Sequence, residues 1–219
     1  MFKLIPDLLS RDDVARLRQI AASAKFTDGR FSNPHSKVKN NLQLHEPAAY
    51  EQAARIILVA MRGHEDFTNF VRPFFTAPPM LTRYTPGMHY GRHTDSAFIQ
   101  AGTDTIRADV SCTVFLSDPA TYEGGALRID MGGEALRFRG APGSALVYPS
   151  NSLHEVEPVT QGERLVAITF IQSRIRDPFK RHLVYELFEV AALEGYNMSY
   201  ENMTRLRHVG QELLRSWAE

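Results

Sequence analysis

The feature that most constrains the fold is an alternation of apolar and polar residues that begins near residue 80 and ends at Ser173. This period of two is typical of β-strands with one buried face. The clearest runs are 110–116, 127–131 and 165–171. Turn-forming pairs lie between the runs: Gly124-Gly125, Gly132-Gly133, Pro142-Gly143 and Gln161-Gly162. Short alternating strands at this spacing predict an antiparallel β-sandwich or barrel.

Helical patterns flank the β region on both sides. Ser10, followed by acidic residues in the first turn, predicts the start of a helix. We expect further helices over 47–62 and 64–71, and two more near 177–194 and 200–218. The stretch between the first two helices, 24–46, is polar and irregular in pattern.

The expected fold class is therefore mainly β with flanking α. No repeat or linker divides the chain, so we expect one domain over residues 1–219. Its parts would be a helical N-terminal part (1–79), a β core (80–173) and C-terminal helices (174–219).

Composition argues against several classes of partner. Lys and Arg balance Asp and Glu at 25 each, which gives no basic patch for nucleic acid or an acidic membrane. No run approaches the ~20 apolar residues of a membrane span, and the first residues lack the apolar stretch of a signal peptide. Cys112 is the single cysteine, so no disulfide can form within the chain. We expect a cytoplasmic protein, with Cys112 in the core.

The first chemical candidate is the pair His93 and Asp95. Residues i and i+2 of a strand project from the same face, so an imidazole nitrogen and a carboxylate oxygen would point together. The pattern His-x-Asp arises often by chance, and a polar pair without a metal is the more frequent outcome. A third ligand is needed to favour a metal site.

His154 is the best third ligand. It lies in a segment rich in Ser and Asn that leads into a strand. Two His and one carboxylate on a β scaffold form the facial triad of non-haem iron(II) oxygenases. His89 would lie ~13 Å from His93 along one strand, too far to share a metal. The remaining histidines are expected to be solvated or capping residues: His35, His45, His64, His182 and His208.

Arg164 could bind a carboxylate of a co-substrate, because its guanidinium donates two parallel hydrogen bonds. If a loop of three residues joins the strand of His154 to the next strand, Arg164 would lie opposite Pro158 and on the same face as His154. The distance from His154 to Arg164 along the strand would then be ~13 Å. A loop of two residues would place Arg164 on the other face. Tyr84 is a weaker candidate to donate its hydroxyl to the same co-substrate, and Thr113 and Tyr148 could line the pocket.

Taken together, these residues resemble the PKHD-type hydroxylases, a prolyl-4-hydroxylase-like branch of the Fe(II)/2-oxoglutarate dioxygenases. The resemblance spans nearly the whole chain. Its motifs are Ile5-Pro6, Asp28-Gly29-Arg30, Val38-Lys39-Asn40-Asn41, Arg83-Tyr84, Tyr90-Gly91, His93-Thr94-Asp95, Phe115-Leu116-Ser117-Asp118-Pro119, Tyr122-Glu123-Gly124-Gly125, Tyr148-Pro149-Ser150, and the run from Ser152-Leu153-His154 through Pro158-Val159-Thr160 to Gly162 and Arg164.

The resemblance implies a double-stranded β-helix, with His93, Asp95 and His154 as iron ligands and Arg164 as the anchor of 2-oxoglutarate. Two positions depart from the family pattern: Ala126 replaces a frequent acidic residue, and Phe170 a frequent Trp. Neither is a proposed ligand.

The expected activity is hydroxylation of an unactivated C–H bond with decarboxylation of 2-oxoglutarate to succinate. The partners would be 2-oxoglutarate, dioxygen and a substrate that no residue of the sequence identifies. L-ascorbate is a further candidate cofactor, and a homo-oligomer is a further expectation. The C-terminal helices could support self-association or cover the β core, and the sequence leaves both roles open. Two alternatives stay open: a cupin-like metalloenzyme that does not use 2-oxoglutarate, and a sensor that binds iron and 2-oxoglutarate without turnover.

Overall fold

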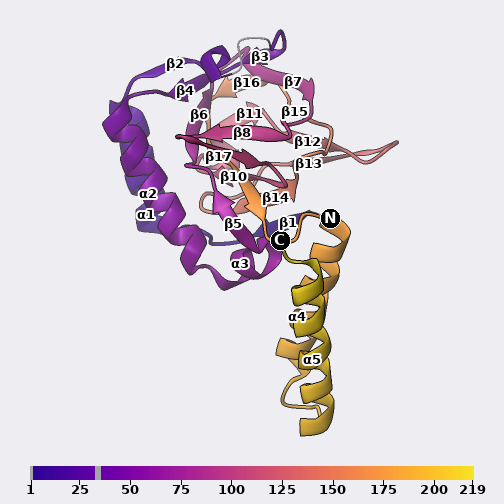
Figure 1. Cartoon of the computed structure of the whole chain (residues 1–219). Helices are drawn as coiled ribbons and strands as arrows, with labels where there is room; N and C mark the ends of the chain where they lie inside the picture. The colour runs from indigo at the N-terminus through magenta and orange to yellow at the C-terminus, as the bar shows by residue number, and fades with distance from the viewer. Residues whose placement is uncertain (1, 33–35) are drawn as a thin grey trace.

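The computed structural model describes residues 2–32 and 36–219. Two antiparallel sheets form its body (Figure 1). The larger sheet has, in spatial order, β1 (Lys3–Ile5), β14 (Ala145–Pro149), β10 (Val110–Phe115), β17 (Arg164–Ser173), β6 (Met80–Tyr84), β4 (Leu42–Leu44) and β2 (Phe26–Asp28), with β5 (Pro73–Thr76) also paired to β17.

The smaller sheet carries, in order, β13 (Ala135–Phe138), β12 (Leu127–Asp130), β15 (His154–Val156), β7 (His89–His93) and β3 (Lys39–Asn40). Two separate antiparallel pairs complete the β structure: β8 (Phe98–Ala101) with β9 (Asp104–Arg107), and β11 (Tyr122–Gly124) with β16 (Val159–Gly162). Single 3₁₀ turns, η1 (Gly29–Ser32) and η2 (Pro119–Thr121), occur in the connections.

The helices begin close to where the sequence predicts them. They are α1 (Arg11–Ser23), α2 (Pro47–Gly63), α3 (Glu65–Val71), α4 (Pro178–Glu194) and α5 (Tyr200–Trp217). Ser10, Asp177 and Ser199 cap α1, α4 and α5 by accepting backbone N–H groups of the first turn. In Figure 1, the first three helices lie beside the sheets, whereas α4 and α5 project away from them as a hairpin. No helix among the described residues is long and apolar enough to cross a membrane.

The alternation along β10 separates two packing regions. Val110, Cys112 and Val114 pack with helix residues such as Leu17 and Ile57 in the outer core. Burial raises the pKa of the Cys112 thiol, as expected of a small core residue. On the other face, Phe115 packs in a second cluster to which both sheets contribute residues. Its other members include Tyr84, Leu127, Ile129, Leu146, Tyr148, Val156 and Val166. That inner space holds the functional side chains.

The N-terminal part contains more than the helices we expected. Five strands, β1 to β5, occur among the described residues of 1–79, and three of them lie in the stretch 24–46 that the sequence shows as irregular. Each has only two to four residues, too few for alternation to be visible. Apart from β2, which pairs with nearby β4, their partners are far away in sequence, as in the pairing of β1 with β14. These short strands are stabilised by backbone hydrogen bonds to neighbouring strands of the sheets.

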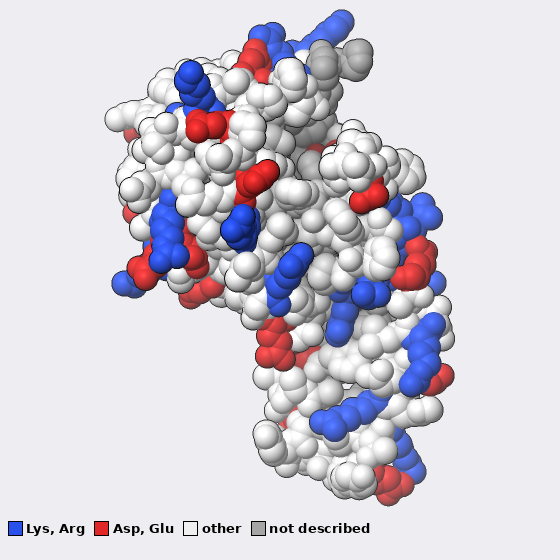
Figure 2. Space-filling model, turned by 60° about the vertical axis from the view of Figure 1, so that its left-hand side comes forward, with Lys and Arg blue, Asp and Glu red and all other residues white. Residues whose placement is uncertain are grey.

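Charged side chains of both signs are interspersed on the face drawn in Figure 2, over the sheets and over the projecting hairpin.

The α4–α5 hairpin contacts the body of the protein through a polar cluster around Tyr185. Lys3 Nζ donates to the Tyr185 hydroxyl at 2.7 Å, and that hydroxyl donates to Asp66 Oδ1 at 2.9 Å. The ring of Tyr185 packs edge-on against Phe70, with ring centroids 5.2 Å apart. One α4 residue thus contacts both β1 and α3.

We expect Tyr185→Phe to lower the free energy of unfolding by about 1–2 kcal/mol, because the ring stays packed while Lys3 and Asp66 lose their shared hydroxyl. Tyr196→Phe is the matched control, since Tyr196 is fully exposed. Chemical denaturation of both variants measures the difference. Equal stability of the Tyr185 variant and the wild type would contradict this role of the hydroxyl.

Candidate metal centre and co-substrate pocket

The three candidate ligands come from two neighbouring strands of the smaller sheet. His93 is the last residue of β7, and Asp95 follows it by two positions. His154 is the first residue of β15. The strands are antiparallel, and His93 and His154 are direct partners in their register. The pairing brings together residues that are about 60 positions apart in sequence.

The ligand atoms of the three side chains all lie within 4.8 Å of one another. Asp95 is central: its Oδ1 lies 3.8 Å from His93 Nε2, and its Oδ2 lies 3.8 Å from His154 Nε2. Each imidazole Nδ1 is close to a backbone carbonyl, at 2.8 Å from Gly91 and 2.9 Å from Ser152 respectively. An Nδ1–H donated to a carbonyl leaves Nε2 as the free lone pair, the arrangement typical of metal-binding histidines.

The electrostatics of the cluster suit a cation. Burial, with the neighbouring His154, lowers the pKa of His93 to about 4, so its imidazole is neutral at pH 7. Burial raises the pKa of Asp95, while His154, Ser111 and Lys39 act in the opposite direction. A neutral imidazole is the form that ligates metals, and a divalent cation would favour the ionised carboxylate. The donor set therefore fits iron(II).

Arg164 lies inside the body as the first residue of β17, and only 1% of its surface is exposed. Its Nε and Nη1 are buried without a hydrogen-bond partner among the described residues. Unpaired buried donors on a charged group are costly unless a ligand satisfies them. A bound carboxylate would do so, and 2-oxoglutarate offers one at its distal end.

The hairpin that we expected from the sequence to bring Arg164 to the face of His154 is wrong. Arg164 does not lie opposite Pro158 on a hairpin with His154. It pairs with Tyr84 of β6 in the larger sheet, whereas His154 belongs to the smaller sheet and β16 pairs with β11. The chain changes sheet at Gly162, whose φ of 74° suits glycine. Arg164 thus comes from the sheet opposite the ligands, and loop length does not decide its position.

The close approach of Arg164 depends on a glycine of the Gly124-Gly125 pair. A Cβ on Gly125 would lie 3.0 Å from Arg164 Cδ and 2.8 Å from Val159 Cγ2. The backbone there has a φ of 61°, which side chains other than hydrogen rarely accept. From the sequence, Gly124-Gly125 is predicted only to form a turn. In the structure, the missing side chain of Gly125 also leaves space for the side chain of Arg164.

Tyr84 supports Arg164. The guanidinium carbon lies 5.0 Å from the centre of the Tyr84 ring, within the range of a cation–π interaction. Burial raises the pKa of the hydroxyl, which keeps it protonated and able to donate. Asn41 Nδ2 donates to the same hydroxyl at 2.9 Å. Sequence reasoning assigned no role to Asn41. Asn41 belongs to the family motif Val38-Lys39-Asn40-Asn41, but nothing in the sequence pattern indicates that it contacts Tyr84.

A second group of residues surrounds the imidazoles. The Tyr90 ring stacks on His93 with centroids 3.7 Å apart, and Tyr148 packs edge-on against His154. Lys39, 6% exposed, places Nζ 5.5 Å from the centre of the Tyr90 ring, and burial lowers its pKa to about 8. Thr113 and Tyr148 are both buried. These rings restrict how the two imidazoles can turn.

The other histidines do not join the cluster. His89 is at the opposite end of β7 from His93. His64 accepts the backbone N–H of Phe67 at the start of α3, and His45 packs against Phe31. His182 pairs with Glu186 on α4, and His208 lies on α5. His35 lies outside the described residues. Among described residues, the only group of three or more potential metal ligands is His93, Asp95 and His154.

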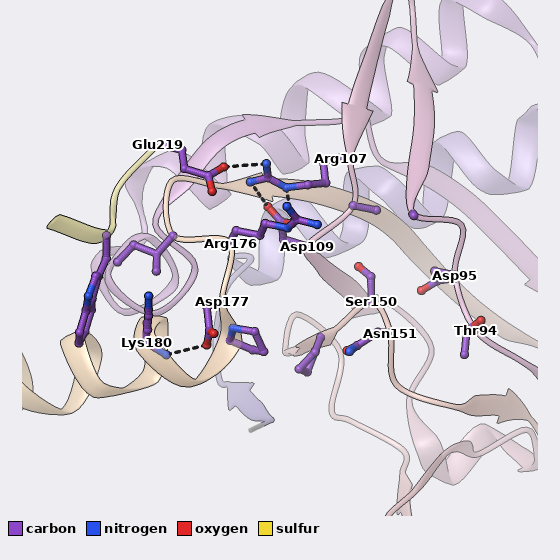
Figure 3. A pocket seen from close by; sticks show the side chains of 16 residues that line it. Thr94, Asp95, Arg107, Asp109, Ser150, Asn151, Arg176, Asp177, Lys180 and Glu219 are labelled. Carbon is purple, nitrogen blue, oxygen red and sulfur yellow. Dashed lines mark hydrogen bonds and ion pairs between the residues drawn. The ribbon is translucent and has the colours of Figure 1, made fainter. Parts of the chain in front are cut away.

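A cavity of about 550 Å³ begins at Thr94 and Asp95 (Figure 3). It extends past Ser150 and Asn151 to Arg176, Asp177 and Lys180 at the base of α4, with Arg107, Asp109 and Glu219 along one side. The segment 174–181 leads from β17 into the first turn of α4. The structure places part of it on the wall of a cavity that reaches a candidate ligand.

Comparison with known proteins identifies the family. A model of the 2OG-Fe(II) oxygenase superfamily matches residues 79–172. A PKHD-type hydroxylase of Sphingopyxis alaskensis is 60% identical over 217 residues, 99% of each chain. A PKHD-type hydroxylase of Thermosynechococcus vestitus is 38% identical over 226 residues and the full length of both.

Solved structures support the fold. A Pseudomonas putida prolyl-4-hydroxylase has a TM-score of 0.54 at 21% identity, covering 79% of this chain and 92% of that one. A collagen prolyl hydroxylase of Paramecium Bursaria Chlorella virus-1 has the same TM-score at 18% identity, covering 78% and 96%. The predicted double-stranded β-helix with flanking helices is thus confirmed. The chain belongs to the PKHD-type hydroxylases of the 2OG-Fe(II) oxygenase superfamily and is an iron(II)- and 2-oxoglutarate-dependent dioxygenase.

Proposed function

We propose that the protein hydroxylates an unactivated C–H bond of its substrate, with His93, Asp95 and His154 as the iron ligands. The observation that carries this proposal is the convergence of their ligand atoms to within 4.8 Å on two paired strands. Two imidazoles and one carboxylate leave positions open for a chelating co-substrate and dioxygen. Bound iron would supply the activation of dioxygen that a C–H oxidation requires.

The co-substrate is assigned to Arg164 and Tyr84. The guanidinium carries the positive charge that binds the distal carboxylate of 2-oxoglutarate, and the Tyr84 hydroxyl can donate a further hydrogen bond. In the balanced reaction, dioxygen and 2-oxoglutarate give succinate, carbon dioxide and one oxygen atom for the substrate C–H bond. The buried inner face of both sheets keeps bulk water from these residues.

The orphaned donors of Arg164 weigh against the cupin-like alternative. A cupin-like enzyme that does not use 2-oxoglutarate has no need of a buried guanidinium beside Tyr84. A sensor would use the same ligand atoms without turnover, and formation of succinate separates it from an enzyme.

The proposal includes four further features. The 219 residues act as one domain. L-ascorbate keeps the iron reduced between turnovers. The protein works in the cytoplasm, which suits the free thiol of Cys112. The α4–α5 hairpin, with Leu193, Tyr196 and Tyr200 exposed, mediates self-association.

We expect His93→Ala to lose iron(II) affinity by at least about 100-fold, because one of three ligands is removed. His89→Ala is the matched control on the same strand and keeps both metal binding and activity. Anaerobic titration with iron(II) and 2-oxoglutarate, read from the metal-to-ligand absorption band, measures binding, and oxygen addition tests succinate formation. Iron binding that survives in the His93 variant would show that the ligand assignment is wrong.

Replacing Arg164 tests the co-substrate assignment. We expect Arg164→Ala to raise the Kd for 2-oxoglutarate roughly 10- to 100-fold. Hydrogen bonds to a charged group contribute ~1.5–3 kcal/mol, which corresponds to a change in Kd of about this size. Iron affinity without 2-oxoglutarate should stay unchanged. Arg137→Ala is the control, since Arg137 is 68% exposed and pairs with Glu157 on the surface. Full activity of the Arg164 variant at low 2-oxoglutarate would show that the assignment of Arg164 to the co-substrate is wrong.

A further inference from the structure

The surroundings of Asp95 are asymmetric. On one side, both carboxylate oxygens face the imidazoles at 3.8 Å. On the other side, Asp95 lines the cavity shown in Figure 3, which extends to the base of α4. Asp95 lies in the loop after β7, outside the strand pairing. Its short side chain could therefore turn toward the cavity and leave the imidazoles unless another group holds it.

Two buried hydroxyls hold it. Ser111 Oγ donates to Asp95 Oδ2 at 2.5 Å, and Ser150 Oγ lies 2.8 Å from Ser111 Oγ. A serine has one hydroxyl proton, so when Ser111 donates to Asp95, Ser150 supplies the proton of the second bond. The two serines are 2% and 3% exposed. The backbone carbonyl of Ser150 also accepts the Asp95 N–H at 3.3 Å.

The two serines belong to the larger sheet. Ser111 is on β10, where its neighbours Val110 and Cys112 face the outer core. Ser150 directly follows β14, which pairs with β10. The hydroxyl chain therefore crosses from the larger sheet to the loop that follows β7 of the smaller sheet. Ser111 shares the inner face of β10 with Thr113 and Phe115, and there its hydroxyl bonds a carboxylate of the smaller sheet's loop.

We propose that Ser111, supported by Ser150, is a positioning residue that fixes the Asp95 carboxylate toward the metal. The proposal rests on the assignment of Asp95 as a ligand. A hydrogen bond from a hydroxyl to a carboxylate is short and strong, and it removes the freedom of the carboxylate to rotate toward the cavity. Residues that orient a metal ligand in this way typically change metal affinity by about 10- to 100-fold when they are replaced.

The test measures the Kd for Co(II) of the full-length apo-protein by competition with a chromophoric chelator. We expect Ser111→Ala to weaken Co(II) binding by about 10- to 100-fold, and Ser150→Ala to weaken it less. Because Ser150 acts through Ser111, the double variant should bind like Ser111→Ala alone. Ser111→Thr, which keeps the hydroxyl, should restore most of the affinity.

Ser144→Ala is the matched control. Ser144 is also buried beside β14, but its hydroxyl donates to the Ala141 carbonyl, so Co(II) affinity should remain that of the wild type. Wild-type affinity in Ser111→Ala, or additive losses in the double variant, would overturn the proposal. If Ser111→Ala does not fold, Ser150→Ala decides: unchanged affinity there overturns it as well. A wild type that binds neither Co(II) nor iron(II) would instead overturn the proposed function, and the positioning role with it.

Discussion

The antiparallel pairing of β7 with β15 is the constraint on which the candidate site depends. Their register makes His93 and His154 direct partners, and Asp95 follows His93 by two residues. A shift of that register by one residue would turn His154 to the other face of the sheet. Backbone hydrogen bonds thus define the distances between the candidate ligands, while the side chains supply the chemistry.

The second requirement is that charged groups remain in a buried space. Arg164 is buried between the sheets, and burial disfavours the charged forms of Asp95 and Lys39. Nearby groups reduce that cost. The Tyr84 ring contacts the guanidinium, and Ser111 donates to the carboxylate. The donors of Arg164 that stay unpaired are the ones a co-substrate carboxylate can satisfy.

The two sheets contribute different components. The smaller sheet provides the two imidazoles, and the loop after its β7 provides the carboxylate. The larger sheet provides Arg164 and Tyr84 as register partners, and also Ser111. The site therefore requires both sheets to fold and to face one another. This explains why residues spread from Asn41 to Arg164 meet in one place, although no local segment contains all of them.

The sequence by itself determined the elements with a strong local signal. Helix caps at Ser10 and Asp177 and the alternation along 110–116 have local physical causes, so α1, α4 and β10 were predictable. His93, Asp95 and His154 were recognisable by residue type and by the family motifs. Tertiary structure alone decided the short strands β1 to β5, the sheet to which Arg164 belongs, and the contacts of Asn41 and Ser111. Those features depend on partners far away in the chain, and a local pattern carries no information about which distant strand will be the neighbour.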